Sequence, residues 1–203
     1  MPGKKAPEER RRAQILRAAF DVAARKGLDG LTVRAVATKA GLSPGLVLFH
    51  FTTKEQLVVA LLDHVLATTT VLHVTEEIAR IVSPLDRLLA LLELEMHRLS
   101  SEPRRIRLFF DFWARGIRHE RIRAKMQAEL HRYREAFRPM AEAVLRAEPE
   151  RFARVTPEGL AAVAVSFIKG CAVQSMIDPA HFDIEEYLVA ARGLLRELAS
   201  SMA

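Results

Sequence analysis

The pentapeptide Gly41-Leu42-Ser43-Pro44-Gly45 matches the nucleophile elbow of α/β-hydrolases and is the first candidate for chemistry in this sequence. In such an elbow a strand leads to the serine, and the residue after the serine donates its backbone N–H to the oxyanion. Here a helical pattern precedes Ser43, and Pro44 has no N–H to donate. The match therefore does not predict acyl transfer, and Ser43 is better explained as a helix N-cap.

No other residues combine into a catalytic or metal-binding pattern. The histidines are scattered, with neither H-E-x-x-H nor paired Cys-His spacing. Cys171 is the single cysteine and lies in an apolar stretch without a nearby base, which favours a buried thiol and a reducing, cytoplasmic setting. We therefore expect no enzyme activity, no metal and no cofactor. The charged N-terminus has no apolar core of the kind found in a secretory signal.

Positive charge is concentrated near the N-terminus. Residues 1–55 hold 11 Lys and Arg against 5 Asp and Glu, whereas residues 56–203 hold 20 of each. A basic segment joined to a neutral remainder is typical of phosphate binding, so double-stranded DNA is the expected partner. We expect the run Arg10-Arg11-Arg12 to contact DNA. The alternative is a solubilising basic tail.

The segment from Thr32 to Lys54 predicts two short helices joined by a tight turn. Val33, Val36, Ala37 and Ala40 share one helical face, and Thr32 is placed to cap it. Gly41 suits the left-handed residue that ends a helix. Ser43 and Pro44 suit the N-cap and first position of the next helix, whose Val47 and Phe51 would enter the core. This layout is that of a helix-turn-helix, whose second helix enters the DNA major groove.

Residues on both sides of the turn complete a longer pattern: Ile15-Leu16, Ala18-Ala19-Phe20, Gly27, Gly30, Thr32-Val33-Arg34, Ala37, Ala40-Gly41-Leu42-Ser43, Gly45, Phe51 and Lys54-Glu55-Gln56-Leu57. With this pattern, the sequence over about residues 10–62 resembles the TetR-type regulators. The resemblance implies an all-α dimer with an N-terminal three-helix DNA-binding domain and a C-terminal helical domain for effector binding and dimerisation. We place these domains at residues 1–55 and 56–203. Near the C-terminus the sequence also resembles, less specifically, the subset related to betaine-synthesis repressors.

The resemblance also implies which residues meet DNA. Thr32 and Lys54 would face phosphates at helix N-termini, and Arg34 would contact a guanine edge. The sequence departs from the family at Leu48, where an aromatic residue is common, and at His50, where tyrosine is common. We therefore expect few hydrogen bonds to bases, and we expect the shape of the DNA to contribute to specificity. The predicted DNA-binding residues are Thr32, Arg34, Ser43, Pro44, Gly45, Leu46, Leu48, Phe49, His50 and Lys54.

The rest of the chain predicts a series of helices. An unbroken helical pattern runs from Thr53 to about Ile81, which predicts one rigid helix joining the two domains. Further helices are expected to begin near Pro84, Pro103, Arg121, Pro157 and Asp183. By resemblance, a ligand cavity for an unidentified small-molecule effector lies among the middle helices, although plain core packing is the favoured explanation for each candidate residue. The candidates are Met96, Phe110, Trp113, Phe137, Phe167 and Gln174.

The two last helices are the expected dimer contact. Residues 159–177 carry one charge, Lys169, so a membrane span is an alternative, but a central lysine makes insertion costly and favours a buried helix. In the last helix, apolar residues step by four and three, which is typical of a seam that packs on another helix. Such helices could pair with their copies in a four-helix bundle. The predicted dimerisation residues are Leu160, Phe167, Cys171, Leu188, Ala191, Leu195 and Leu198.

Together these features predict a ligand-responsive repressor that binds a pseudo-palindromic operator as a homodimer and is released by a small, partly apolar effector. A general DNA-compacting protein would need a basic surface over most of the molecule, and the neutral remainder does not provide one.

Overall fold

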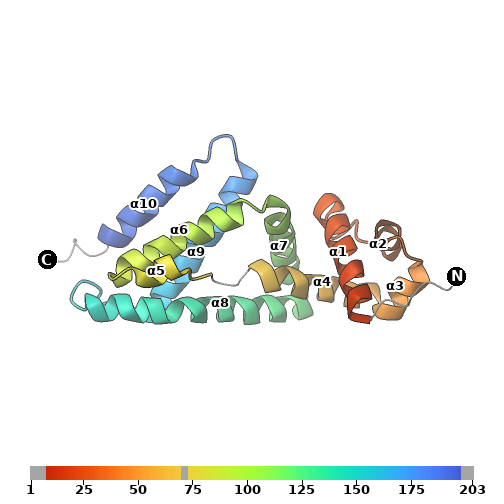
Figure 1. The fold of residues 1–203 in the computed structure, drawn as a ribbon, viewed down its shortest axis with the longest axis horizontal. Helices are drawn as coiled ribbons and strands as arrows, with labels where there is room; N and C mark the ends of the chain where they lie inside the picture. Colours follow the sequence, from red (N-terminus) through yellow and green to blue (C-terminus); the bar gives the residue numbers. More distant parts are fainter. Residues whose placement is uncertain (1–7, 70–72, 198–203) are drawn as a thin grey trace. The chain divides into compact units, whose positions relative to one another are not determined.

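The computed structural model describes residues 8–69 and 73–197, and within these ranges every regular element is a helix (Figure 1). This confirms the predicted all-α fold. The helices are α1 (Glu8–Lys26), α2 (Val33–Ala40), α3 (Pro44–His50), α4 (Lys54–Thr69), α5 (Glu76–Arg80), α6 (Pro84–Ser100), α7 (Pro103–Gly116), α8 (Glu120–Ala147), α9 (Pro157–Ile177) and α10 (Ile184–Glu197).

Most helices begin and end where local chemistry predicts. The Thr156 hydroxyl accepts from the backbone N–H of Gly159 at the start of α9, and Asp183 accepts from Glu185 at the start of α10. Gly27, which follows α1, has a φ of 68°, a conformation that favours glycine. These are short-range interactions, so sequence patterns report them well.

The predicted continuous helix from Thr53 to about Ile81 is wrong. α4 ends at Thr69, and the separate helix α5 begins after Thr75, whose hydroxyl accepts from the backbone N–H of Ile78 over 3.3 Å. From Thr68 to Thr75 the sequence is rich in β-branched residues, which lose side-chain freedom in a helix. The two helices are therefore not one rigid rod. The β-branched residues are Thr68, Thr69, Thr70, Val71, Val74 and Thr75.

The chain divides into two compact units, and each unit is made of two separate stretches of sequence. Unit 1 comprises residues 1–69 and 107–126, and unit 2 comprises residues 70–106 and 127–203. Helices α7 and α8 each contribute residues to both units.

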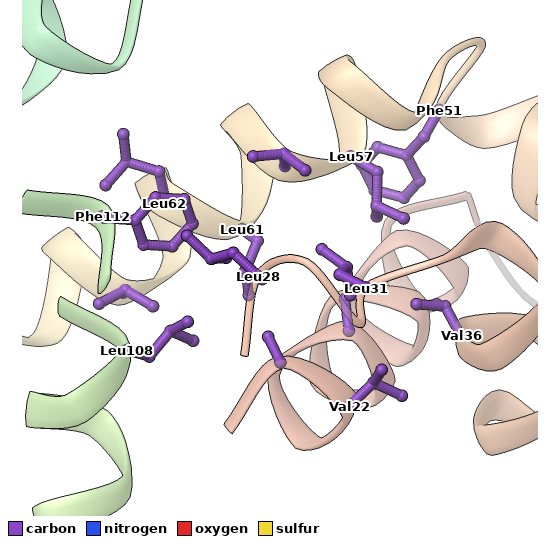
Figure 2. Packing of buried hydrophobic residues seen from close by; sticks show 14 of the residues in the cluster. Val22, Leu28, Leu31, Val36, Phe51, Leu57, Leu61, Leu62, Leu108 and Phe112 are labelled. Carbon is purple, nitrogen blue, oxygen red and sulfur yellow. The ribbon is translucent and has the colours of Figure 1, made fainter. Parts of the chain in front are cut away.

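Unit 1 is held together by one apolar cluster. Its buried side chains come from α1 to α4 and from residues 108–126, as Figure 2 shows for Leu61 and Leu62 of α4 beside Leu108 and Phe112 of α7. Burying side chains of this size contributes about 1.5 to 3 kcal/mol each before entropy is counted. The helix-turn-helix is thus anchored to α4 and, through α4, to a segment distant in sequence.

Unit 2 is built around α6 and α9, which pack side by side with α10 against them. Ion pairs join α10 to α6, among them Arg196 with Asp86 at 2.8 Å and Arg192 with Glu93. Among the described helices, α9 alone has the length and hydropathy of a membrane span by itself, a property that core helices share. Eight of its residues are buried in the chain's own packing.

Candidate nucleic-acid interface

The helix-turn-helix in unit 1 has the predicted local geometry. The Thr32 hydroxyl accepts from the backbone N–H of Ala35 over 3.1 Å, and Gly41 has a φ of 67°. The Ser43 hydroxyl accepts from the N–H of Leu46 over 3.2 Å, with Pro44 in the first turn of α3. Ser43 is therefore a helix cap, as predicted, and its hydroxyl is used in folding.

α3 presents an apolar surface to solvent. Val47 is fully buried beneath the helix, whereas Phe49 is 78% exposed and Leu48 is 43% exposed. Contiguous exposed apolar side chains, rather than single ones, are typical of interaction surfaces, and Leu48 and Phe49 are adjacent in α3. Of the other predicted DNA-binding residues, Leu46 and His50 are half-buried, and the exposed ones are Thr32, Arg34, Ser43, Pro44, Gly45 and Lys54.

Two exposed cations stand out because their charges are not used within the fold. Arg34, in the first turn of α2, and Lys54, at the start of α4, make no ion pair with any residue that the structure describes. Neighbouring Lys39, in contrast, pairs with Asp21 at 3.4 Å. A cation at a helix N-terminus is repelled by the positive end of the helix dipole. A bound anion would interact favourably with both the cation and the helix N-terminus.

His50 has only one ring nitrogen that can meet a ligand. Its Nδ1 is buried and makes no hydrogen bond among the described residues. The ring packs edge-on against Phe49, with centroids 5.2 Å apart. Its chemistry toward DNA is therefore confined to Nε2.

Arg12, one of the arginines expected to contact DNA, makes two contacts inside unit 1. Its Nη1 donates to the backbone carbonyl of His50 over 2.6 Å, and its guanidinium lies 4.4 Å from the centre of the Phe51 ring. Arg11 donates to the side chain of Gln14, and Arg10 is exposed. The sequence motif marks these arginines but does not distinguish their roles.

Three ion pairs connect residues 107–126 with the turn between α1 and α2 and with α4, all within unit 1. Arg115 pairs with Asp29 at 2.5 Å, Arg121 with Glu55 at 3.1 Å, and Lys125 with Asp63 at 2.5 Å. A surface pocket of about 400 Å³ adjoins them. Its lining residues are Lys54, Glu55, Val58, Val59, Arg115, His119 and Ile122.

The candidate effector residues are divided between the two units. Phe110 and Trp113 belong to unit 1, where they are half-buried against its core. In unit 2, Met96 and Phe137 are fully buried and Phe167 is half-buried. Gln174 is exposed and borders a surface pocket of about 310 Å³ with Val173, Ile177, Asp178, His181 and Phe182.

Sequence reasoning missed a buried polar network in unit 2. Glu95 is fully buried and accepts hydrogen bonds from Arg98 at 2.5 Å and from the Tyr133 hydroxyl at 3.1 Å. Lys169 is 7% exposed, and its ammonium lies 5.0 Å from the centre of the Tyr133 ring. The signal was Glu95 among the leucines of α6 and Lys169 as the one charge of residues 159–177, but the residues that these side chains meet are distant in sequence.

The protonation of this network is set by burial. Burial, assisted by the nearby Arg98, lowers the pKa of Lys169 to about 7, although Glu95 and Glu129 oppose the shift. Burial and the neighbouring Glu95 raise the pKa of Tyr133, so its hydroxyl stays protonated and donates. Lys169 therefore titrates near neutral pH.

The predicted dimerisation residues are mostly occupied within the chain. The ones that are fully or almost fully buried within this single chain are Leu160, Cys171, Leu188, Ala191 and Leu195. Phe167 is half-buried, and Leu198 lies outside the described residues. The large apolar residues that α9 and α10 do expose are Val163, Ile177, Val189 and Leu194.

Comparison with known proteins agrees with this architecture. Residues 15–61 match the model of the tetR family of bacterial regulatory proteins, and residues 84–200 match the C-terminal model of BetI-type transcriptional repressors. The HTH-type transcriptional regulator BetI of Stenotrophomonas maltophilia is 28% identical over 165 residues, or 79% of this chain and 80% of BetI. The HTH-type transcriptional repressor Rv3405c of Mycobacterium tuberculosis is 46% identical over 52 residues, or 26% of this chain and 28% of that protein.

Solved structures share the fold. GusR of Salmonella enterica aligns with a TM-score of 0.72 at 19% identity, covering 98% of this chain and 100% of GusR. A transcriptional regulator of Saccharomonospora viridis in complex with choline aligns with a TM-score of 0.71 at 16% identity, covering 93% of this chain and 96% of that one. With both parts of the sequence matched, the chain belongs to the TetR family of bacterial transcriptional regulators, with a C-terminal part of the BetI-type repressor class.

Proposed function

We propose that this DNA-binding regulator is a cytoplasmic repressor that holds a pseudo-palindromic operator as a homodimer and releases it when a small, partly apolar effector binds. Residues 1–55 would bind the DNA, and residues 56–203 would bind the effector and self-associate. The observation that carries the proposal is the exposed face of α3, where Phe49 and Leu48 are open to solvent, in a unit where Arg34 and Lys54 are exposed and form no ion pair with the described residues.

At the DNA, each contact would have its own role. Thr32 and Lys54 would bind phosphates, which set position, and Arg34 would donate to a guanine edge, which sets sequence. Leu48 and Phe49 would meet thymine methyl groups. Ser43, Pro44, Gly45 and Leu46 would line the groove in the first turn of α3, where backbone approach is close. His50 would offer Nε2 to a base or phosphate.

The test is a selection of bound sequences from a random duplex library, followed by mobility shifts with excess competitor DNA. Enrichment of an inverted repeat with half-sites about one helical turn apart would support the proposal. Binding that shows no sequence preference would point instead to general DNA compaction and would contradict it.

Dimer formation would bury the exposed apolar residues of α9 and α10. Val189 and Leu194 are 69% and 57% exposed on α10, and Val163 is 39% exposed on α9. The buried seam residues would support this surface from within. Light scattering should give twice the chain mass, and Leu194→Glu should reduce it toward the monomer. A monomeric wild-type protein would end the dimer proposal.

Choline is the first effector to test, because the structural relative from Saccharomonospora viridis was solved with it. Calorimetric titration with choline chloride should show binding, with sodium chloride at equal ionic strength as the control. Added choline should also weaken the mobility shift of the operator duplex. A titration without heat together with an unchanged mobility shift would exclude choline. Native mass spectrometry of the purified protein would then identify a co-purifying effector. The residues to substitute in testing where that effector binds are Met96, Phe110, Trp113, Phe137, Phe167 and Gln174.

A further inference from the structure

We propose that Arg12 of α1 is a positioning residue for the recognition helix α3, and that it acts through protein contacts rather than through DNA. The proposal rests on the proposed DNA interface. It concerns a residue outside the helix-turn-helix whose sequence context, in a run of three arginines, suggests a phosphate contact.

The first step is the state of the C-terminal end of α3. The helix has seven residues, Pro44–His50, and isolated helices of this length are unstable in water. Its last carbonyl groups have no partner within the helix. Arg12 Nη1 donates to one of them, the carbonyl of His50, over 2.6 Å, from a residue 38 positions away in sequence. A cation at a helix C-terminus also complements the helix dipole.

The second step is the contact with Phe51, the residue that follows α3. Phe51 is 2% exposed, and its ring lies 4.4 Å from the Arg12 guanidinium carbon. A flat guanidinium can stack on a ring and donate to a carbonyl simultaneously, which a lysine ammonium cannot do. Arg12 thus binds both the last residue of α3 and the buried residue that anchors it.

The third step is a matching contact at α2. Gln14, two residues from Arg12, donates through Nε2 to the carbonyl of Ala40 at the end of α2 over 2.8 Å, and Arg11 holds the Gln14 amide. The start of α1 therefore binds the C-terminal ends of both helices of the helix-turn-helix. These contacts fix the angle at which α3 leaves the turn, and with it the positions of Phe49 and His50.

A positioning role and a phosphate contact predict different measurements. Loss of a phosphate contact weakens binding to every sequence and lowers the salt dependence, d log K/d log[salt], by about 0.9. Loss of positioning disturbs base contacts, so it weakens binding to the selected sequence more than to other DNA and leaves the salt dependence unchanged.

The experiment measures affinities of the full-length protein for the duplex selected by the wild type and for a scrambled duplex of equal composition, at several salt concentrations. For Arg12→Ala we expect the ratio of the two affinities to fall about tenfold, with an unchanged salt slope. For Arg10→Ala, the exposed arginine on the same helix, we expect an unchanged ratio. Equal losses on both duplexes with a reduced slope, or no loss at all, would overturn the proposal for Arg12.

Two further measurements guard against a general loss of folding. Hydrogen exchange followed by mass spectrometry should show faster exchange in residues 44–51 of Arg12→Ala, with residues 15–26 unchanged. Arg12→Lys keeps the charge and a donor but loses the planar group that stacks on Phe51. Its ratio of affinities for the selected and scrambled duplexes should lie between those of Arg12→Ala and the wild type. If the wild type itself selects no sequence, the proposed function fails, and that result is distinct from an unchanged ratio in Arg12→Ala.

Discussion

The hydroxyl of Tyr133 donates a hydrogen bond to Oε2 of Glu95 over 3.1 Å, and neither side chain is exposed to solvent. Arg98 donates to the same carboxylate from the adjacent turn of α6. A buried carboxylate that loses a donor keeps the cost of its burial without the compensating bond. The interaction therefore has a larger effect on stability than its single hydrogen bond indicates.

Tyr133→Phe should lower the free energy of unfolding by about 1 to 3 kcal/mol, because Glu95 stays buried with one donor fewer. Urea denaturation measures the change. Tyr187→Phe is the matched control, since the Tyr187 hydroxyl donates to the carbonyl of Phe167 at a half-buried position and its loss should cost less. Equal effects of the two substitutions would show that the network has no special weight.

Lys169 makes stability depend on pH. Because its pKa is lowered to about 7 in the folded protein, the unfolded chain binds more protons above that pH, and stability rises with pH. The full cost of burying the charge is present below pH 7 and is relieved as the pH rises through 7 toward the unfolded value of about 10.4.

Urea denaturation of the wild type and Lys169→Met at pH 6, 7, 8 and 9 tests this dependence. The wild type should gain up to about 1.4 kcal/mol per pH unit over the variant between pH 7 and 9, and little below pH 7. The difference in free energy of unfolding between the two proteins at each pH removes the contributions of the other titrating groups, which both proteins share. A constant difference from pH 6 to 9 would mean that Lys169 does not titrate in this range.

Arg34→Ala and Lys54→Ala should weaken DNA binding in different ways. Arg34→Ala should cost about 1 to 3 kcal/mol and relax selectivity at one position in each half-site. Lys54→Ala should weaken all sequences alike and lower the salt slope by about 1. Repeating the library selection with each variant separates these effects. An unchanged preferred sequence for Arg34→Ala would remove Arg34 from the base-contacting residues.

Phe49→Ala should affect binding but not folding. The side chain is 78% exposed, so the free energy of unfolding should change by no more than about 0.5 kcal/mol. Affinity for the selected duplex should fall by about 1 to 2 kcal/mol, because an apolar contact in the groove is lost. Val82→Ala, at a position that is 90% exposed outside the helix-turn-helix, should alter neither quantity. A marked loss of stability in Phe49→Ala would indicate packing instead.

Helix caps and buried faces were predictable from the sequence because each depends on residues within one or two turns. Thr32, Gly41 and Ser43 occupy the predicted positions for this reason. The length of α4 was not predictable from periodicity alone, because the apolar spacing continues past Thr69. The helix nevertheless ends at Thr69, and Thr75 caps a new helix, α5.

Contacts between residues distant in sequence could not be predicted from local patterns of capping residues and apolar spacing. Arg12 donates to a carbonyl 38 residues away, and Glu95 meets Tyr133 across the same separation. The seam of α10 predicted a helix partner, but the spacing does not say whether that partner lies in the same chain. Its Leu188, Ala191 and Leu195 are buried in their own chain.

The composition of unit 1 has a consequence for building hybrid regulators. A graft that exchanges only residues 1–69 between two relatives would leave the imported α4 facing a foreign Leu108, Phe112 and Ile122. Successful hybrids should therefore carry residues 107–126 with the graft, or match these side chains and the acids opposite Arg115, Arg121 and Lys125. The same requirement would restrict how natural recombination can trade one operator preference for another.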